Sequence, residues 1–170
     1  LADSQGRDVD PDEAGELLLR GPQLFSGYLD DPICTAESFD AAGWFRTGDL
    51  ASRDADGAYS ICGRRKEMFI SGGENVYPVE VERALYDHPA VKEAAVVGVP
   101  DPRWGEVGAA FVVLREPLAA EALRAFLKAR LAGYKVPKHL IFLEELPKTG
   151  PGKVQKEALK RLWEEQHGQA

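Results

Sequence analysis

The segments "VKEAAVVGV" (residues 91–99) and "VGAAFVVL" (107–114) decide the fold of this chain. Both are rich in valine, and β-branched residues favour strands. The second segment is nearly continuous in apolar side chains, which is typical of a strand that is buried on both faces. Such a sheet needs other elements packed against it. We therefore expect an α+β domain with these two strands at its centre.

The residues before these strands predict a strand, a turn and a helix. "EMFIS" (67–71) is typical of a strand, and the pair Gly72-Gly73 predicts a turn after it. "PVEVERALYDH" (78–88) predicts a helix with Pro78 at its first position, where the missing N–H costs nothing. The side chains that we expect to face inward from this helix are Val81, Leu85 and Tyr86.

The residues after these strands complete the order β-α-β-β-α-β-α. "LAAEALRAFLKARLAG" (118–133) predicts an amphipathic helix that is closed by Gly133 at its C′ position. "HLIFLEEL" (139–146) predicts a third long strand, and "KEALKRLWEEQ" (156–166) predicts a last helix. The apolar side of the first of these helices carries Leu123, Phe126, Leu127 and Leu131. We expect a small three-stranded sheet with flanking helices.

The first third of the chain has a different character. "GELLLRG" (15–21) and "AYSICG" (58–63) predict short strands, and "TAESF" (35–39) predicts a short helix with Thr35 as its N-cap. These elements have little core of their own, so we interpret this part as the β-rich end of a larger domain.

The character of the sequence changes near residues 64–66. We therefore expect two domains, with the remnant of a large domain over residues 1–64 and a complete small domain over residues 65–170. Met68 is the only methionine, which fits a piece of a longer protein.

Composition limits the function classes. The chain is 44% hydrophobic and 29% charged, and no apolar run approaches the roughly 18 residues of a membrane span. Two cysteines, Cys34 and Cys62, suggest neither a disulfide framework nor a metal site, so we expect a reducing, cytoplasmic location. The formal net charge of −7 argues against a nucleic-acid partner.

The charge is distributed unevenly. Residues 1–65 carry 13 acids against 6 Lys and Arg, whereas residues 134–161 carry 7 Lys and Arg against 3 acids. A local basic zone on an acidic protein suits a small polyanion, although a solvated basic face is the alternative.

One loop of the basic zone presents a single lysine. "PKTGPGKVQK" (147–156) places Lys153 after a run of Pro, Thr and Gly. It is not a phosphate-binding P-loop, because Pro147 and Val154 occupy positions where that motif needs Gly and Ser or Thr. A mobile lysine remains, which is useful if it must enter another site and leave it again.

Two further segments are candidates for ligand contact. In "WFRTGDL" (44–50), Asp49 follows a glycine turn and can offer its oxygens to a vicinal diol such as ribose, or simply form an Asx-type turn. In "GRRKEMFISGGEN" (63–75), a basic run and two glycines form either a ligand-binding edge or a hairpin with a basic edge that discourages aggregation. Neither His88 nor His139 is expected to be catalytic, and no Cys/His cluster has metal-ligand spacing.

Taken together, these segments resemble one family. The motifs that follow in order are "GELLLRGPQLFSGYLDDP" (15–32), "GWFRTGDL" (43–50), "GRRKEMFISGGENVYPVEVE" (63–82), "HPAVKEAAVVGVPDPRWGE" (88–106) and "YKVPKHLIFLEELPKTGPGK" (134–153). Their order and spacing resemble the adenylate-forming (AMP-binding) enzymes, which include acyl-CoA synthetases, adenylation domains of peptide synthetases and firefly luciferases. The segment "SGGENVYPVEVE" (71–82) resembles the acyl-CoA and aryl-CoA synthetases in particular.

The resemblance implies a role for each matching residue. Asp49 would bind the ribose hydroxyls of ATP and of the acyl-adenylate, with Arg64 beside the same nucleotide. Lys66 would be the hinge between a large N-terminal and a small C-terminal domain, and Lys153 would be the catalytic lysine of the adenylation step. The residues implied for binding coenzyme A are Gly72, Gly73, Trp104, Tyr134 and Lys138.

The implied function is that of an ATP-dependent acyl-CoA synthetase, of which this chain is the C-terminal part and is inactive alone. The cofactors are ATP or AMP, coenzyme A, and Mg²⁺ that travels with ATP and is held mostly by residues outside this chain. The implied partners are a small carboxylic acid, the N-terminal domain of the same parent chain, and a lysine acetyltransferase that acts on Lys153. The alternatives are a stand-alone module that binds a nucleotide or a partner protein, and an adenylation unit that loads a carrier protein.

Overall fold

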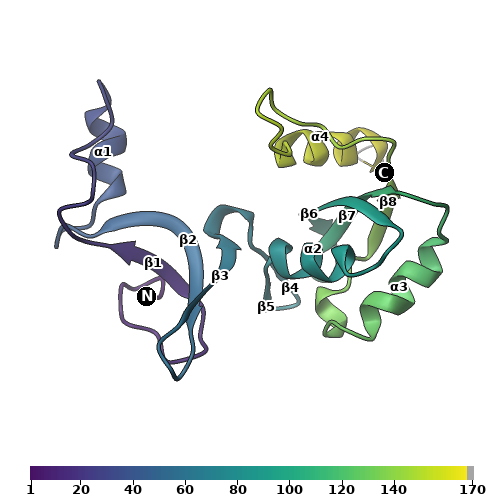
Figure 1. Cartoon of the computed structure of the whole chain (residues 1–170), viewed down its shortest axis with the longest axis horizontal. Helices are drawn as coiled ribbons and strands as arrows, with labels where there is room; N and C mark the ends of the chain where they lie inside the picture. Colours follow the sequence, from purple (N-terminus) through teal and green to yellow (C-terminus); the bar gives the residue numbers. More distant parts are fainter. Residues whose placement is uncertain (168–170) are drawn as a thin grey trace. The chain divides into compact units, whose positions relative to one another are not determined.

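The computed structural model describes residues 1–167 and divides into two compact units (Figure 1). The N-terminal unit comprises Leu1–Lys66, and the C-terminal unit begins at Glu67. This division falls at the end of the segment where the sequence changes character. No helix within residues 1–167 combines the length and the apolar composition that crossing a membrane requires.

A three-stranded antiparallel sheet forms the N-terminal unit. Its strands are β1 (Gly15–Leu19), β2 (Phe45–Arg53) and β3 (Tyr59–Arg64), in the order β1-β2-β3. The sequence predicts β1 and β3 but not β2, because the Thr-Gly-Asp segment has turn character. Gly48 does adopt a φ of +71°, yet the strand continues on both sides of it.

The short helix α1 (Pro32–Ser38) begins earlier than expected, and its N-cap is Asp31 rather than Thr35. The Asp31 carboxylate accepts a hydrogen bond from the Cys34 amide at 2.9 Å. Thr35 lies inside the helix, where its hydroxyl donates to the Asp31 carbonyl and accepts from the Tyr28 amide. The expectation for Thr35 is therefore wrong, because a better cap with Pro32 after it lies four residues upstream.

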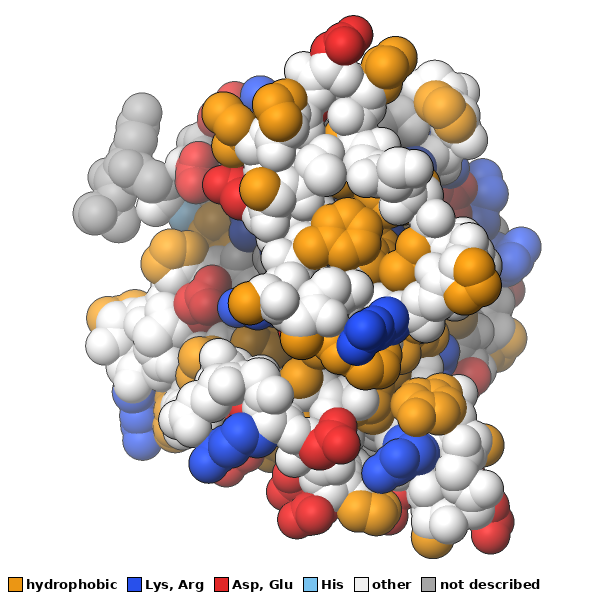
Figure 2. All heavy atoms as spheres, turned by 90° about the vertical axis from the view of Figure 1, so that its left-hand side faces the viewer, with side chains coloured by type: hydrophobic (Ala, Val, Ile, Leu, Met, Phe, Trp, Pro, Cys, Tyr) orange, Lys and Arg blue, Asp and Glu red, His pale blue; other side chains and the backbone are white. Residues whose placement is uncertain are grey.

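The N-terminal unit buries few apolar side chains. Its buried hydrophobic residues are Ala2, Leu50 and Ala51. An aromatic group lies nearer the surface, with ring centroids 5.0–6.0 Å apart, and consists of Phe25, Tyr28, Phe39 and Phe45. The view toward this unit shows hydrophobic side chains gathered at the surface (Figure 2). The most exposed large ones are Leu29 at 92% and Ile33 at 72%.

The C-terminal unit is built on a larger sheet with β7 at its centre. The strands are β4 (Phe69–Ser71), β5 (Glu74–Val76), β6 (Val91–Asp101), β7 (Gly105–Leu114) and β8 (His139–Phe142). The order β5-β4-β7-β6 is antiparallel, and β8 pairs with β7 in parallel. The strands β6, β7 and β8 lie where strands are predicted, but β8 is short and the sheet has five strands rather than three. The difference arises because the β4–β5 hairpin joins β7 through the pairing of Ser71 with Gly105.

Helices cover both faces of this sheet (Figure 1). The helices α2 (Pro78–Tyr86) and α3 (Ala120–Lys128) pack on one face, where Val81, Leu85, Leu123 and Leu127 are buried. The helix α4 (Lys156–His167) packs on the other face through Leu159 and Trp163. Successive residues of β7 alternate between these two cores, so the predicted burial of this strand on both faces is confirmed.

Three local expectations are wrong. The helix α3 ends at Lys128, and Gly133 instead opens the 3₁₀ turn η2 (Gly133–Lys135). The strand β8 stops at Phe142, before the charged pair Glu144-Glu145. The Tyr86 ring is half exposed, because its hydroxyl hydrogen-bonds the backbone of Ala94 at the edge of the helix–sheet contact.

Candidate functional site

The Lys153 loop is more ordered than its Pro and Gly content suggests. The Thr149 amide donates to the Lys153 carbonyl at 2.8 Å, and the Gly152 amide donates to the Thr149 carbonyl at 2.8 Å. The Lys153 amide donates to the Thr149 hydroxyl at 3.2 Å. Lys148 and Val154 then pair as an isolated antiparallel bridge at the base. This closed turn holds the backbone while it leaves the Lys153 side chain exposed.

The basic zone around this loop is largely neutralised by ion pairs. Four of its seven cations face carboxylates at 2.5–2.9 Å. The pairs are Lys135–Glu80, Lys138–Asp101, Lys148–Glu93, and Lys156 with both Glu67 and Glu82. Lys153 forms no such pair within residues 1–167. The basic zone is therefore poorly suited to bind a polyanion over its whole surface. Its distinctive feature is the exposed Lys153 side chain on a hydrogen-bonded turn.

In the N-terminal unit, the structure brings Asp49 and Arg64 together. They face each other across β2 and β3, and the Arg64 Nε lies 2.8 Å from the Asp49 Oδ1. Arg64 also donates to the Thr47 carbonyl at 3.0 Å, and the Thr47 hydroxyl accepts from the Asp49 amide at 3.0 Å. These bonds fix a carboxylate that is 29% exposed and whose second oxygen can accept from a ligand hydroxyl.

An open hollow of about 560 Å³ lies beside this pair, within the N-terminal unit. Its lining residues are Glu16, Cys34, Glu37, Ser38, Arg46, Thr47, Gly48, Arg64, Arg65 and Lys66. Four of them are cations, of which Arg46 and Arg65 face the Glu16 carboxylate at 3.6 and 3.1 Å. Arg64 faces Asp49 at 2.8 Å, so Lys66 is the lining cation that has no ion pair within residues 1–167, and its charge suits an anionic ligand.

Gly72 and Trp104 form one compact feature of the C-terminal unit. The Gly72 amide donates to the Trp104 carbonyl at 2.9 Å, and Gly72 has a φ of +62°. A Cβ atom on Gly72 would lie 2.7 Å from the Trp104 ring. The indole therefore lies flat against the glycine backbone, which only glycine permits. Gly73 also has a positive φ, but nothing lies within 4 Å of a Cβ built on it.

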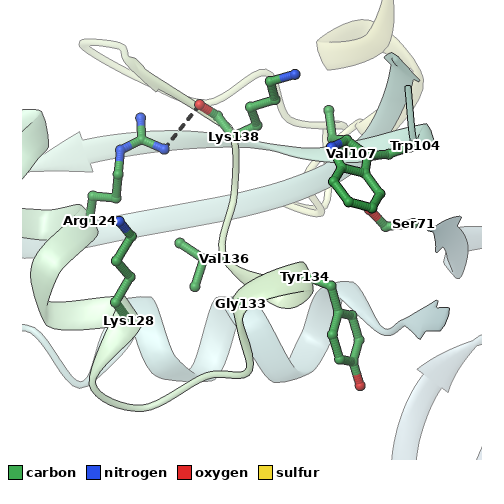
Figure 3. A pocket seen from close by; sticks show the side chains of 9 residues that line it. All are labelled: Ser71, Trp104, Val107, Arg124, Lys128, Gly133, Tyr134, Val136 and Lys138. Atoms are coloured by element: carbon green, nitrogen blue, oxygen red, sulfur yellow. Dashed lines mark hydrogen bonds between the residues drawn. The ribbon is translucent and has the colours of Figure 1, made fainter. Parts of the chain in front are cut away.

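A second hollow, of about 400 Å³, opens beside Trp104 (Figure 3). Its lining residues are Ser71, Trp104, Val107, Arg124, Lys128, Gly133, Tyr134, Val136 and Lys138. Arg124 and Lys128 lie at one end of it, and Trp104 and Ser71 lie at the other. The hollow thus combines an aromatic wall with cationic groups, which suits a ligand with both apolar and anionic parts.

Lys138 is held at the rim of this second hollow by Asp101. The Asp101 side chain is only 4% exposed, and its other oxygen accepts from the amides of Arg103 and Trp104. The hydrogen bond from Lys138, followed by the one from the Arg103 amide, holds the pKa of the Asp101 carboxyl below its usual value of 3.8. Asp101 therefore couples the Trp104 turn to Lys138.

The structure gathers Trp104, Tyr134 and Lys138 at one hollow, with Gly72 directly behind Trp104, while Gly73 does not line it. Sequence reasoning missed Arg124 and Lys128. Both lie on α3, one turn apart, but this spacing is common on solvated helix faces, so the sequence offers no specific signal for them. Arg124 is fixed by donating to the carbonyls of Pro137 and Lys138 at 2.8 and 3.1 Å.

The histidines expected to be non-catalytic have structural contacts. His88 accepts from the Ala90 amide and meets the edge of Phe126. His139 packs on Trp163, and burial lowers the pKa of its imidazole. Within residues 1–167, no group of three or more His, Cys, Asp or Glu side chains is arranged to hold a metal ion.

The chain is similar to known proteins of one kind. Residues 80–153 match the AMP-binding enzyme C-terminal domain. The chain is 49% identical over 163 residues to a feruloyl-CoA synthase of Amycolatopsis sp, with 95% of this chain and 33% of that protein covered. The chain spans about one third of the length of the curated relatives that it matches.

Two solved structures show the same fold. The o-succinylbenzoate CoA synthetase of Bacillus subtilis, in complex with its acyl-adenylate intermediate, superposes with a TM-score of 0.89 at 40% identity. That match covers 94% of this chain and 33% of the other. The amide bond synthetase of Marinactinospora thermotolerans gives a TM-score of 0.86 at 37% identity, with 95% and 33% covered. Residues 80–153 therefore match the C-terminal domain of AMP-binding enzymes, and the chain shares the fold of these adenylate-forming enzymes over 94–95% of its length.

Proposed function

We propose that this chain is the C-terminal part of an ATP-dependent carboxylate–CoA ligase. In the first step a carboxylate oxygen attacks the α-phosphorus of ATP, and pyrophosphate leaves. In the second step the sulfur of coenzyme A attacks the acyl carbon, loses its proton, and expels AMP. ATP brings Mg²⁺ as part of the substrate, and we assign the metal ligands to residues outside this chain.

One observation carries the proposal, namely that the Lys153 turn and the hollow beside Trp104 are separate features of the C-terminal unit, because Lys153 does not line the hollow. The Lys153 turn leads directly into α4, which covers one face. The hollow beside Trp104 is lined by residues of α3 and η2, and α3 covers the other face. We infer that these two features act in different steps, because they are built from different elements of the unit. Two steps that each use one surface, with a rotation between them, account for the arrangement.

The residue roles follow from the chemistry of each step. Lys153 places an ammonium between the carboxylate and the α-phosphate, and so offsets the repulsion between two anions. Asp49 and Arg64 hold the ribose and the nucleotide through both steps. Acetylation of Lys153 by a lysine acetyltransferase would remove the charge that the first step needs.

We assign the Trp104 hollow to coenzyme A. Gly72 and Trp104 line the path of the pantetheine arm, with Gly73 in the same turn. Tyr134 and Lys138 contact the nucleotide end. The aromatic wall and the cations in the second hollow support a ligand that combines an extended arm with phosphates.

Lys66 is the proposed hinge. It is the last residue of the N-terminal unit and lies in the 3₁₀ turn η1 (Arg65–Glu67). In the full-length protein, Lys66→Pro should spare ATP–pyrophosphate exchange and impair thioester formation, because proline fixes φ and removes the N–H. Equal losses in the two assays would exclude a hinge at this position.

The test of the proposed function is a panel of carboxylic acids with the full-length protein. Each acid is assayed for ATP–pyrophosphate exchange and, separately, for a CoA thioester by mass spectrometry. We expect at least one acid to support both. A second candidate function is an adenylating enzyme that transfers the acyl group to an amine or to a carrier protein. Pyrophosphate exchange without any thioester, but with amide formation on an added amine or loading of a carrier protein, would favour this second candidate. The likeness to an amide bond synthetase motivates that second candidate. Nucleotide binding with no exchange for any acid would instead indicate a binding module.

A further inference from the structure

Lys156 is the centre of an ion-pair cluster that the proposed roles leave unexplained. Its Nζ lies 2.7 Å from the Glu67 Oε2 and 2.9 Å from the Glu82 Oε1. The Lys156 side chain is 19% exposed, and the two carboxylates are 24% and 17% exposed. One ammonium is thus largely enclosed between two carboxylates, and removal of Lys156 would leave both carboxylates without their counter-charge.

The position of Lys156 is not explained by helix stability. It is the first residue of α4, where the helix dipole disfavours a positive charge. The contacts that it makes therefore account better for its presence. Glu82 is fixed in turn, since its Oε1 also accepts from the Val96 amide of β6 at 2.9 Å.

This cluster joins three parts of the C-terminal unit. Glu67 immediately follows Lys66, Glu82 lies on α2, and Lys156 lies three residues after Lys153. The loop has a second fixed end, because Lys148 pairs with Glu93 of β6 at 2.6 Å. The base between them is closed by the bond from the Gln155 amide to the Pro147 carbonyl. Both ends of the Lys153 turn are therefore tied to the sheet and α2.

We propose that Lys156 is a positioning residue that ties the Lys153 turn to the segment immediately after Lys66. Through Glu67, a change of backbone angle at Lys66 is passed to the base of the turn, so Lys153 moves with the whole unit. The assignment rests on the proposed function, in which Lys153 acts in the first step only. Without the tie, the turn would shift relative to the rest of the unit and misplace the ammonium.

The activity test uses Lys156→Met in the full-length protein. We expect the kcat of ATP–pyrophosphate exchange to fall about tenfold to a hundredfold, as for a misplacement of roughly 1 Å, with little change in KM for the carboxylate. Thioester formation from synthetic acyl-adenylate should stay within about twofold of wild type, since Lys153 is not used there. Lys156→Arg should restore most of the exchange rate, because a guanidinium can bridge two carboxylates.

Two variants separate positioning from a general loss of charge. Lys160→Met removes a cation from the same helix, and Lys160 forms no ion pair within residues 1–167, so both half-reactions should stay near wild type. Glu67→Gln should reproduce the Lys156→Met loss, and the double variant should lose little more than either single one. Additive losses, or equal losses in both half-reactions, would overturn the proposal.

A readout independent of activity is hydrogen exchange at the amides of Thr149, Gly152 and Lys153. Lys156→Met should speed their exchange while it leaves β7 unchanged, and Lys160→Met should do neither. Unchanged hydrogen exchange at these three amides in Lys156→Met would overturn the proposal even if the enzyme is active. If no acid supports pyrophosphate exchange in the wild-type protein, the proposed function fails, yet this measurement still decides whether Lys156 holds the turn.

Discussion

The two units of the chain differ in how completely they bury their apolar side chains. In the C-terminal unit, valine and alanine of β6 and β7 are almost completely enclosed by helices on two faces. In the N-terminal unit, large apolar side chains such as Leu29 and Ile33 are exposed, and few are buried. From this contrast we propose that the C-terminal unit can fold by itself, whereas the N-terminal unit needs further apolar residues to complete its core.

The largest expected effect is on local stability. Amides of β7 should exchange with a free energy of opening about 5 kcal/mol or more above that of β1 in the chain studied alone, because only β7 is covered on both faces. Native-state hydrogen exchange measures both strands in one experiment. Equal protection of Gly15–Leu19 and Gly105–Leu114 would contradict the expected difference in stability between the two units.

The next effect separates the two units by their place in the reaction. Lys153→Ala in the full-length protein should slow adenylation by roughly 10²–10³, the usual loss for one preorganised charge contact. Thioester formation from synthetic acyl-adenylate should stay near wild type. Asp49→Ala is the matched variant of the N-terminal unit and should impair both steps, since the ribose is bound throughout. A Lys153→Ala loss of equal size in both steps would contradict the assignment.

A smaller effect is expected at the hollow beside Trp104, which we have proposed for the second step. Gly72→Ala should destabilise the C-terminal unit by about 1–2 kcal/mol, because an alanine at positive φ is strained and its Cβ meets the Trp104 ring. Gly73→Ala is the control, since its Cβ would enter open space at a similar positive φ. Thioester formation should fall more in Gly72→Ala than in Gly73→Ala, with pyrophosphate exchange equal in the two.

The smallest effect concerns stability at acid pH, and it tests the ion pair between Asp101 and Lys138 at the rim of the second hollow. Asp101 has a folded-state pKa below 3.8 because Lys138 and two amides stabilise the carboxylate. Its contribution to stability is complete above the unfolded-state value and is lost as pH falls through the lowered folded-state value. Lys138→Met should therefore lower the melting temperature near neutral pH and flatten its fall below about pH 4. Parallel pH curves for the two proteins would exclude this pairing as the cause.

The sequence predicts the central strands well because the apolar pattern that defines them lies within each strand's own residues. The nearly continuous apolar run of 107–114 is typical of a strand buried on both faces, and α4 begins at its expected residue. The end of α3 could not be predicted in the same way. The apolar period continues to Leu131, which packs on the core from outside the helix, so the pattern extends beyond the hydrogen-bonded turns.

The candidate site shows the same limit. Family motifs point to Lys153 and Trp104, but the ion pairs of Lys156 join residues that are far apart in the chain. Arg124 likewise looks like an ordinary polar-face residue until Pro137 and Lys138 are placed beside it. Such contacts depend on tertiary packing, and no local pattern encodes them.

The strand β7 pairs with β4, β6 and β8 and sends side chains into both cores. A cavity made under α4 must therefore weaken the same backbone ladder that supports α2 and α3. The unit should melt in a single two-state transition, with equal calorimetric and van't Hoff enthalpies. A destabilising substitution on one face of the sheet therefore also destabilises the other face, so the Lys153 turn and the Trp104 hollow are lost at the same melting temperature.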